Sequence, residues 1–237
     1  MIIKQNLIAM KRLIVLCAII YFTSLSYGQI LIGLSAGTTL SSMSVERRDL
    51  STFKIKPIFG FNFNLITEYK INQNFSLYSG LSLSQKGFKQ SIRYFYRPDV
   101  DSTAEMISKL NYLEIPVYLK FNTSLNKINF FYGIGPYFSL GINGKVTSNI
   151  TGRTNASYTD EITWDKKMYF QSDLVEEYGY TNIKRFDIGI GNLIGINYNT
   201  LVFTLSYQYS LRNIMWEYYQ DEKMSNSSLA LSLGYRF

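Results

Sequence analysis

In this 237-residue chain, the side chains that could take part in acid-base or ionic chemistry are mostly single charged residues. They lie within segments that otherwise consist of apolar or small residues. Several charges share a side with glycine and serine in alternating stretches: Glu68, Lys86, Glu114, Lys120, Arg185, Asp187 and Arg236. Inside a narrow interior they would have to pair, because a buried charge is costly when it is left alone. The sequence therefore predicts a charge cluster that packs and closes the interior, with a proton or ion path as the alternative.

Catalytic arrangements are not predicted. The chain contains no histidine, so a Ser-His-Asp triad cannot be assembled. The carboxylates Asp99, Asp101 and Glu105 lack the further ligands and the glycine of a calcium loop, which favours a solvated loop. The glycines of Gly133–Gly135 fall inside a strand pattern and not at a phosphate-binding turn. We expect no catalytic residue, no metal site and no cofactor.

Period-two alternation is the dominant pattern in the chain. In the segment 200–212, large apolar residues alternate with small or polar ones, which places the two sets on opposite faces of a strand. The same alternation predicts eight strands in all, near 30–42, 56–70, 74–88, 108–122, 128–145, 183–198, 200–212 and 226–237. Most of these exceed the usual strand length of about five or six residues.

The connections between the predicted strands alternate between short and long. The short ones are 71–73, 123–127 and Asn199, and the long ones are 43–55, 89–107, 146–182 and 213–225. An antiparallel up-and-down barrel in an outer membrane has short periplasmic turns and long extracellular loops. The fold class we predict is therefore an all-β, eight-stranded transmembrane β-barrel with four long extracellular loops.

The two faces indicate which side meets lipid. The small and polar face suits the filled lumen of an eight-stranded barrel, while the apolar face lacks charge in its centre and suits hydrocarbon. A soluble lipocalin-like barrel, with the apolar face inside, is the alternative. The closing segment LALSLGYRF presents Leu233, Tyr235 and Phe237 on the apolar face, and we interpret these residues as a carboxy-terminal strand signal. This last strand must pair with the first one, because a free strand edge is not tolerated in hydrocarbon.

The amino terminus has the layout of a secretory signal peptide. Lys11 and Arg12 precede an apolar run from Leu13 to Phe22, which is shorter than the roughly 20 residues of a membrane-spanning helix. Small residues follow, so we predict a signal peptide over residues 1–28 and an outer-membrane barrel domain over 29–237. Without Lys4, Lys11 and Arg12 of the signal peptide, the formal net charge of +7 falls to about +4, which is too mild and too mixed with acids to indicate nucleic acid as a partner.

Several segments together resemble the PorT-like family of outer-membrane β-barrel proteins from Gram-negative bacteria. They are Asn111–Phe121 (NYLEIPVYLKF), Ser84–Lys89 (SQKGFK), Phe131–Ile142 (FYGIGPYFSLGI) and the closing SLGYRF. The resemblance covers nearly all of the chain after the signal peptide. It implies an outer-membrane location and, more weakly, an association with secretion.

We expect a structural, binding or assembly-associated role through the long loops, with a small pore or a soluble ligand carrier as the alternatives. The expected partners are outer-membrane lipid and lipopolysaccharide, the barrel-assembly machinery during insertion, and a protein or glycan at the aromatic-rich loops.

Overall fold

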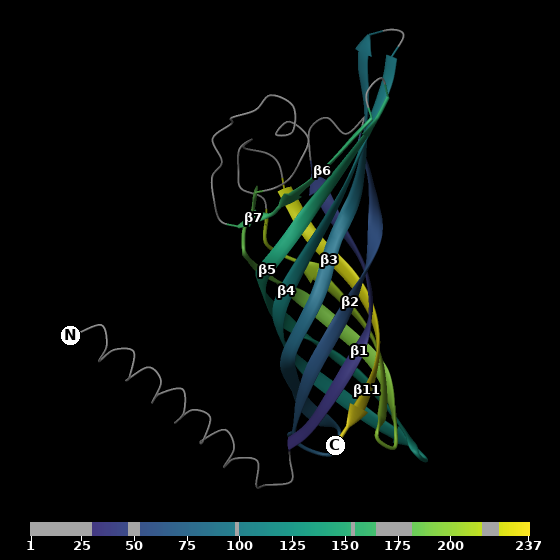
Figure 1. The fold of residues 1–237 in the computed structure, drawn as a ribbon. Coiled ribbons are helices and arrows are strands. Elements are labelled where there is room, and N and C mark those ends of the chain that lie inside the picture. The colour runs from purple at the N-terminus through teal and green to yellow at the C-terminus, as the bar shows by residue number, and fades with distance from the viewer. Residues whose placement is uncertain (1–29, 47–52, 98–99, 153–154, 165–181, 215–222) are drawn as a thin grey trace, which may run out of the picture.

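The computed structural model describes residues 30–46, 53–97, 100–152, 155–164, 182–214 and 223–237. These segments form a tall antiparallel β-barrel whose strands are strongly tilted, with one end extended into a projecting hairpin (Figure 1). The predicted signal peptide, residues 1–28, lies outside the described residues. Within the described residues, no helix has both the length and the apolar character needed to cross a membrane.

Within the described residues, the barrel wall consists of β1 (Ile30–Glu46), β2 (Phe53–Lys70), β3 (Phe75–Arg97), β4 (Val100–Leu125), β5 (Ile128–Thr151), β9 (Phe186–Tyr198), β10 (Leu201–Ser210) and β11 (Lys223–Arg236). A ninth strand, β6 (Ala156–Glu161), pairs with the outer end of β5, and the short strands β7 (Thr163–Trp164) and β8 (Asn182–Ile183) pair with each other. The eight predicted strands are confirmed, each with its ends shifted by a few residues or extended.

The ring closes between the first and the last strand. β1 pairs antiparallel with β11 from Gly33 opposite Arg236 to Glu46 opposite Lys223. At the terminus itself, the backbone N–H of Phe237 donates to the carbonyl of Ile32 at 2.9 Å. Closure through β4 and β5 on the other side of the ring leaves the wall without a free edge at membrane depth, as a hydrocarbon environment requires.

The outward face of the wall is apolar and exposed. Leu231 is 61% exposed, Phe63 55% and Ile194 50%, although each lies in the middle of a strand. Their neighbours along the strand point inward, and Ser232 and Asn62 are buried. This arrangement contradicts the soluble carrier alternative, which needs the large apolar residues inside.

The short connections at the other end are built from asparagine. Asn126 and Asn199 adopt positive φ angles of 54° and 52° in the β4–β5 and β9–β10 turns, a conformation that asparagine tolerates better than most residues. In the β2–β3 turn the side-chain oxygen of Asn72 accepts the backbone N–H groups of Asn74 at 2.9 Å and Phe75 at 2.8 Å. These compact turns keep one rim of the barrel short.

The long side differs from the prediction in two connections, 89–107 and 146–182. The segment 89–107, expected to be a loop, is almost entirely strand, because β3 and β4 remain paired up to Arg97 opposite Val100. Cross-strand hydrogen bonding does not stop where the bilayer ends, so the two strands form the hairpin that projects beyond the barrel (Figure 1). β5 likewise continues to Thr151 and pairs there with β6. The remaining long connections, 47–52, 165–181 and 215–222, lie outside the described residues.

Candidate functional site

The lumen is the candidate site, and its charges are arranged in separate groups. Near the short-turn rim, Nζ of Lys120 on β4 lies 2.6 Å from Oε2 of Glu68 on β2, across the intervening strand β3. The hydroxyl of Ser76 on β3 donates to the other carboxylate oxygen of Glu68 at 2.6 Å. Lys120 also lies over the ring of Phe131, 4.1 Å from its centroid. Both charges are thus paired, and the aromatic face further stabilises the ammonium group.

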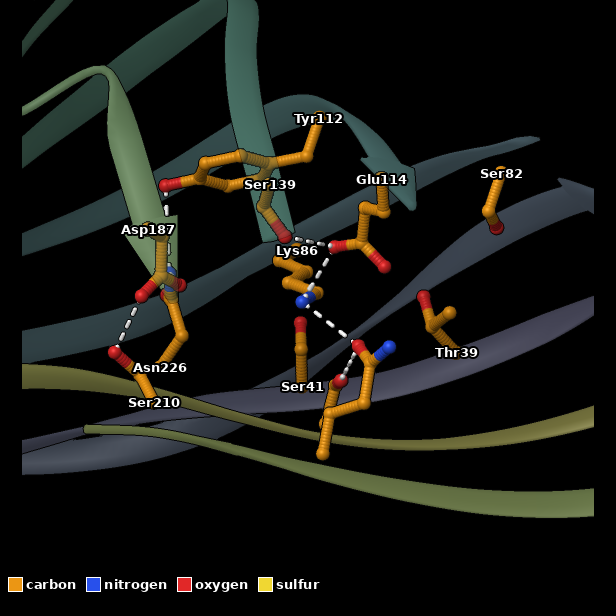
Figure 2. A network of polar contacts seen from close by, with 12 residues as sticks. Thr39, Ser41, Ser82, Lys86, Tyr112, Glu114, Ser139, Asp187, Ser210 and Asn226 are labelled. Carbon is orange, nitrogen blue, oxygen red and sulfur yellow. Dashed lines mark hydrogen bonds and ion pairs between the residues drawn. The ribbon is translucent and has the colours of Figure 1, made fainter. Parts of the chain in front are cut away.

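A second group occupies the middle and outer part of the lumen (Figure 2). Nζ of Lys86 lies 2.6 Å from Oε1 of Glu114 and donates to Oε1 of Gln208 at 2.9 Å. The hydroxyl of Ser139 donates to the same oxygen of Glu114 at 3.1 Å. Lys86 is also 4.7 Å from the ring centroid of Tyr137. Lys86 on β3 is therefore held by residues from three other strands, β4, β5 and β10.

The third group surrounds Asp187 on β9 (Figure 2). One carboxylate oxygen accepts a hydrogen bond from the hydroxyl of Ser210 at 2.5 Å, and the other accepts one from Nδ2 of Asn226 at 3.0 Å. Nδ2 of Asn226 also donates, at 3.4 Å, to the hydroxyl of Tyr112. Asp187 is fully buried, so these neutral donors provide the direct contacts of its charge.

An aromatic and aliphatic layer separates the first group from the other two. The rings of Tyr78 and Tyr118 stack with centroids 5.9 Å apart and planes 8° apart. Tyr118 packs with Leu193 and Phe131 in a buried cluster. We call these four residues the inner plug. Bulky side chains from β3, β4, β5 and β9 meet here and fill this part of the lumen.

A larger apolar core closes the lumen toward the extracellular end. Its fully buried members include Phe88 on β3, Leu110 and Tyr112 on β4, and Met224 on β11. The remaining members of this core, which we call the outer plug, are Met43, Met106, Val146, Ile162, Ile183 and Ile214, with Ile55 and Trp164 packed against it. This core was not predicted from the sequence.

Little space remains between the packed groups. A cavity of about 50 Å³ lies beside Lys86, Glu114 and Tyr118, and one of about 20 Å³ lies near Glu68, Lys120 and Arg236. Volumes of this size hold one or a few water molecules. Neither of these two cavities is large enough for a solute.

The predicted lumen charges therefore have different environments. Five of them, Glu68, Lys86, Glu114, Lys120 and Asp187, are buried in the lumen, and Arg236 is half-buried beside Glu68 and Lys120. Arg185 differs from the prediction: its side chain is exposed at the edge of β9, which begins at Phe186, while its backbone carbonyl accepts the N–H of Gly141 on β5 at 2.7 Å. The terminal residues Leu233, Tyr235 and Phe237 face outward, with the last two rings 5.3 Å apart.

Sequence reasoning missed the residues that hold these charges, among them Tyr112, Tyr137, Gln208 and Asn226. All four occupy positions of inward parity in the alternation, which was the available signal. Leu193 was visible only as a break in the alternation of β9, and it is the leucine of the inner plug. Within the described residues, no group of three or more Asp, Glu, Cys or His side chains gathers to hold a metal ion.

A closed antiparallel ring with an apolar exterior and a packed polar interior defines an integral membrane β-barrel. The chain belongs to the family of outer membrane protein beta-barrel domains, whose model matches residues 23–215. The protein is therefore a protein of the outer membrane. No curated protein matches the chain.

Solved outer-membrane structures are similar to this chain at low identity. The outer membrane protein OprG from Pseudomonas aeruginosa is 11% identical, with 88% of this chain and 96% of that chain covered and a TM-score of 0.43. The Neisserial surface protein A is 12% identical, with 87% and 97% covered and a TM-score of 0.38. The attachment invasion locus protein Ail of Yersinia pestis, in complex with a heparin analogue, is 14% identical, with 88% and 99% covered and a TM-score of 0.36.

Proposed function

We propose that this protein is a non-conducting barrel of the PorT-like type, which acts as a membrane-embedded scaffold and binds partners through its extracellular segments. It is not a catalyst. The observation that supports the proposal is that two buried clusters of bulky side chains, the inner plug and the outer plug, lie one above the other in the lumen. A lumen packed in this way obstructs the passage of ions. It also makes the barrel rigid, which suits a scaffold.

The extracellular part supports the binding role. The β3–β4 hairpin and β6 carry the sheet beyond the barrel rim, and the side chains of Ser157–Glu161 on β6 are all exposed. β6 pairs with β5 on one side, and no described strand pairs with its other side. A strand with an open edge is able to accept an extended segment of a partner protein through backbone hydrogen bonds.

Assembly of the barrel gives the chain a second partner in the cell, the barrel-assembly machinery. In support, Leu233, Tyr235 and Phe237 form an exposed apolar stripe at the end of β11. Replacing Phe237 by serine should lower the yield of membrane-inserted protein in cells while leaving refolding into detergent largely intact. Equal losses in both settings would contradict recognition of this terminus.

Single-channel recording in planar bilayers tests the absence of conduction. The full chain, refolded and inserted, should give no conductance steps under an applied voltage. A variant with both Tyr118→Ala and Leu193→Ala, which removes the centre of the inner plug, serves to show whether the outer plug alone blocks ions. Reproducible steps from the unaltered chain would contradict the scaffold proposal and favour the small pore.

Affinity capture from solubilised outer membranes tests the binding role. The unaltered chain should retain a defined protein or glycan, and replacement of the exposed side of β6 should abolish retention. Ser157→Pro and Thr159→Pro remove backbone N–H donors from β6 without touching the barrel wall. The same set of captured molecules with and without these substitutions would contradict binding at this edge.

A further inference from the structure

The outward surface of β3, β4 and β5 changes character in steps toward the extracellular side. Leu83, Leu113 and Leu140 are cross-strand partners and form one apolar tier on the wall. Leu140 is 45% exposed and Leu83 36%, so the tier faces the membrane. It marks the upper part of the surface that hydrocarbon covers.

The next tier toward the extracellular side consists of amide side chains. Nε2 of Gln85 on β3 donates to Oδ1 of Asn111 on β4 at 3.1 Å. Nδ2 of Asn111 in turn donates to Oδ1 of Asn143 on β5 at 2.6 Å. This polar ladder lies directly above the leucines in register, so the transition from oil to the polar interface occurs between the two tiers.

Lysines follow the amides. Lys109 on β4 stands directly opposite Lys145 on β5, and Lys56 on β2 stands opposite Lys89 on β3. We call these four residues the lysine tier. Like charges directly opposite each other on a sheet face destabilise the pairing. An arrangement of this kind therefore favours an anion between or above the ammonium groups.

Protein carboxylates neutralise only part of this charge. Lys89 forms an ion pair with Glu105 at 2.5 Å, and Glu161 on β6 is the cross-strand neighbour of Lys145. Within the described residues, Lys56, Lys109 and Lys145 form no ion pair, and all three are exposed. The lysine tier thus keeps a net positive charge.

The height of the lysine tier matches the lipid headgroups. Lys109 precedes Leu113 by four residues, which is about 13 Å along a strand at roughly 3.3 Å per residue. With a strand tilt of roughly 40°, this is about 10 Å above the leucine tier along the membrane normal. The flexible lysine side chains are long enough to reach down from there into the headgroup layer.

On the opposite side of the barrel, the described strand pairings place no lysine directly opposite another lysine, and Lys223 on β11 stands opposite Glu46 on β1. At the outer ends of β1 and β11, Ser42 stands opposite Ser227 and Ser44 opposite Ser225. Among the described strand pairings, lysine stands opposite lysine between β2 and β3 and between β4 and β5, and this register indicates a site for a negatively charged ligand there.

We propose that the lysine tier binds the phosphate groups of lipopolysaccharide in the outer leaflet. The amide ladder contacts the sugar layer, and the leucine tier contacts the acyl chains. This inference goes beyond the scaffold role and does not depend on it. It assigns the side of the barrel formed by β2 to β5 as the binding site for lipopolysaccharide. Because the attraction is electrostatic, the binding should weaken as the salt concentration rises.

Binding of fluorescent lipopolysaccharide to the full chain, refolded in zwitterionic nanodiscs, tests the proposal. The double variant with Lys109→Gln and Lys145→Gln should bind about tenfold more weakly than the unaltered chain, because two phosphate contacts are lost. The double variant with Lys109→Arg and Lys145→Arg keeps the charge and should bind within about twofold of the unaltered chain. Dephosphorylated lipopolysaccharide should bind as weakly to the unaltered chain as intact lipopolysaccharide does to the Gln variant.

A variant with the same change in net charge at the other rim is the matched control. Lys70→Gln with Lys127→Gln alters two exposed lysines on the short-turn side and should leave binding unchanged. Equal affinity of the unaltered chain and the Lys109/Lys145 Gln variant would overturn the proposal, as would an equal loss in the control. Competition by millimolar inorganic phosphate as effective as that by unlabelled lipopolysaccharide would also overturn it, since the ligand would then be free phosphate.

Discussion

Lys120 and Glu68 form a buried ion pair across β3, with Nζ 2.6 Å from Oε2 and both residues almost fully inaccessible to solvent. Ser76 lies between them in the sheet and supplies the second contact of the carboxylate. Residues of three adjacent strands, β2, β3 and β4, therefore hold the pair in place. The pair can form only when these three strands are in the observed register.

Removing one partner of this pair should be far more damaging than removing both. Glu68→Gln or Lys120→Met alone leaves an uncompensated buried charge and should lower the free energy of unfolding by about 3 to 5 kcal/mol. The double variant should lose clearly less than the sum of the two single losses. Urea unfolding in phospholipid vesicles measures all three. Additive losses would show that the two side chains do not interact.

Leu193 should dominate the stability of the inner plug. It is 1% exposed, and Leu193→Ala should cost about 2 to 5 kcal/mol because it leaves a cavity among rigid aromatic rings. A Cβ added at Gly133 would lie 3.2 Å from Cγ of Leu193. Gly133→Ala should therefore be unfavourable in the unaltered chain but recover part of the loss when combined with Leu193→Ala. A penalty from Gly133→Ala that is the same in both backgrounds would contradict this packing.

Gly141 should be required for the position of Trp164. A methyl group at Gly141 would overlap the indole ring of Trp164, which packs against the outer plug. Gly141→Ala should displace the indole toward water and shift its fluorescence emission to longer wavelength. The chain has two tryptophans, so Trp216→Phe is included in both samples to isolate the signal. Identical emission spectra would place Trp164 elsewhere.

A charge on the lipid face should be costly only at membrane depth. Leu231 is 61% exposed in the middle part of β11, and Leu231→Lys should lower the free energy of unfolding in vesicles by about 2 to 4 kcal/mol. Ser225→Lys on the same strand, beyond the bilayer, should change it by less than about 1 kcal/mol. Comparable losses at both positions would contradict the placement of the membrane around the apolar belt.

The alternation in the sequence was sufficient to predict the wall, because the side-chain period of a strand is two wherever the strand lies. It placed Leu231 outside and Glu114 inside without any knowledge of their neighbours. It could not pair Lys86 with Glu114, since that contact depends on the stagger between β3 and β4. It also assigned Arg185 to a strand that begins one residue later.

The outer plug shows a second limit of the alternation. Met43, Met106 and Met224 occupy inward positions, but each is apolar where the pattern lower in the barrel is polar. Such positions read as interruptions in a single strand. Only closure of the ring brings these methionines from β1, β4 and β11 into one buried cluster. A β-bulge between Asn111 and Tyr112 further changes which residues of β5 face inward.

The seam between β1 and β11 joins the earliest and the latest segments of the wall to be synthesised. The backbone N–H and C=O groups of β1 that face β11 have no hydrogen-bond partner until β11 has been synthesised. A polypeptide cut short within β11 would have no way to shield those groups from hydrocarbon, however well the other strands had formed. Stable insertion into the membrane is thereby tied to a complete β11, and the geometry of the ring itself discriminates against products that lack this strand.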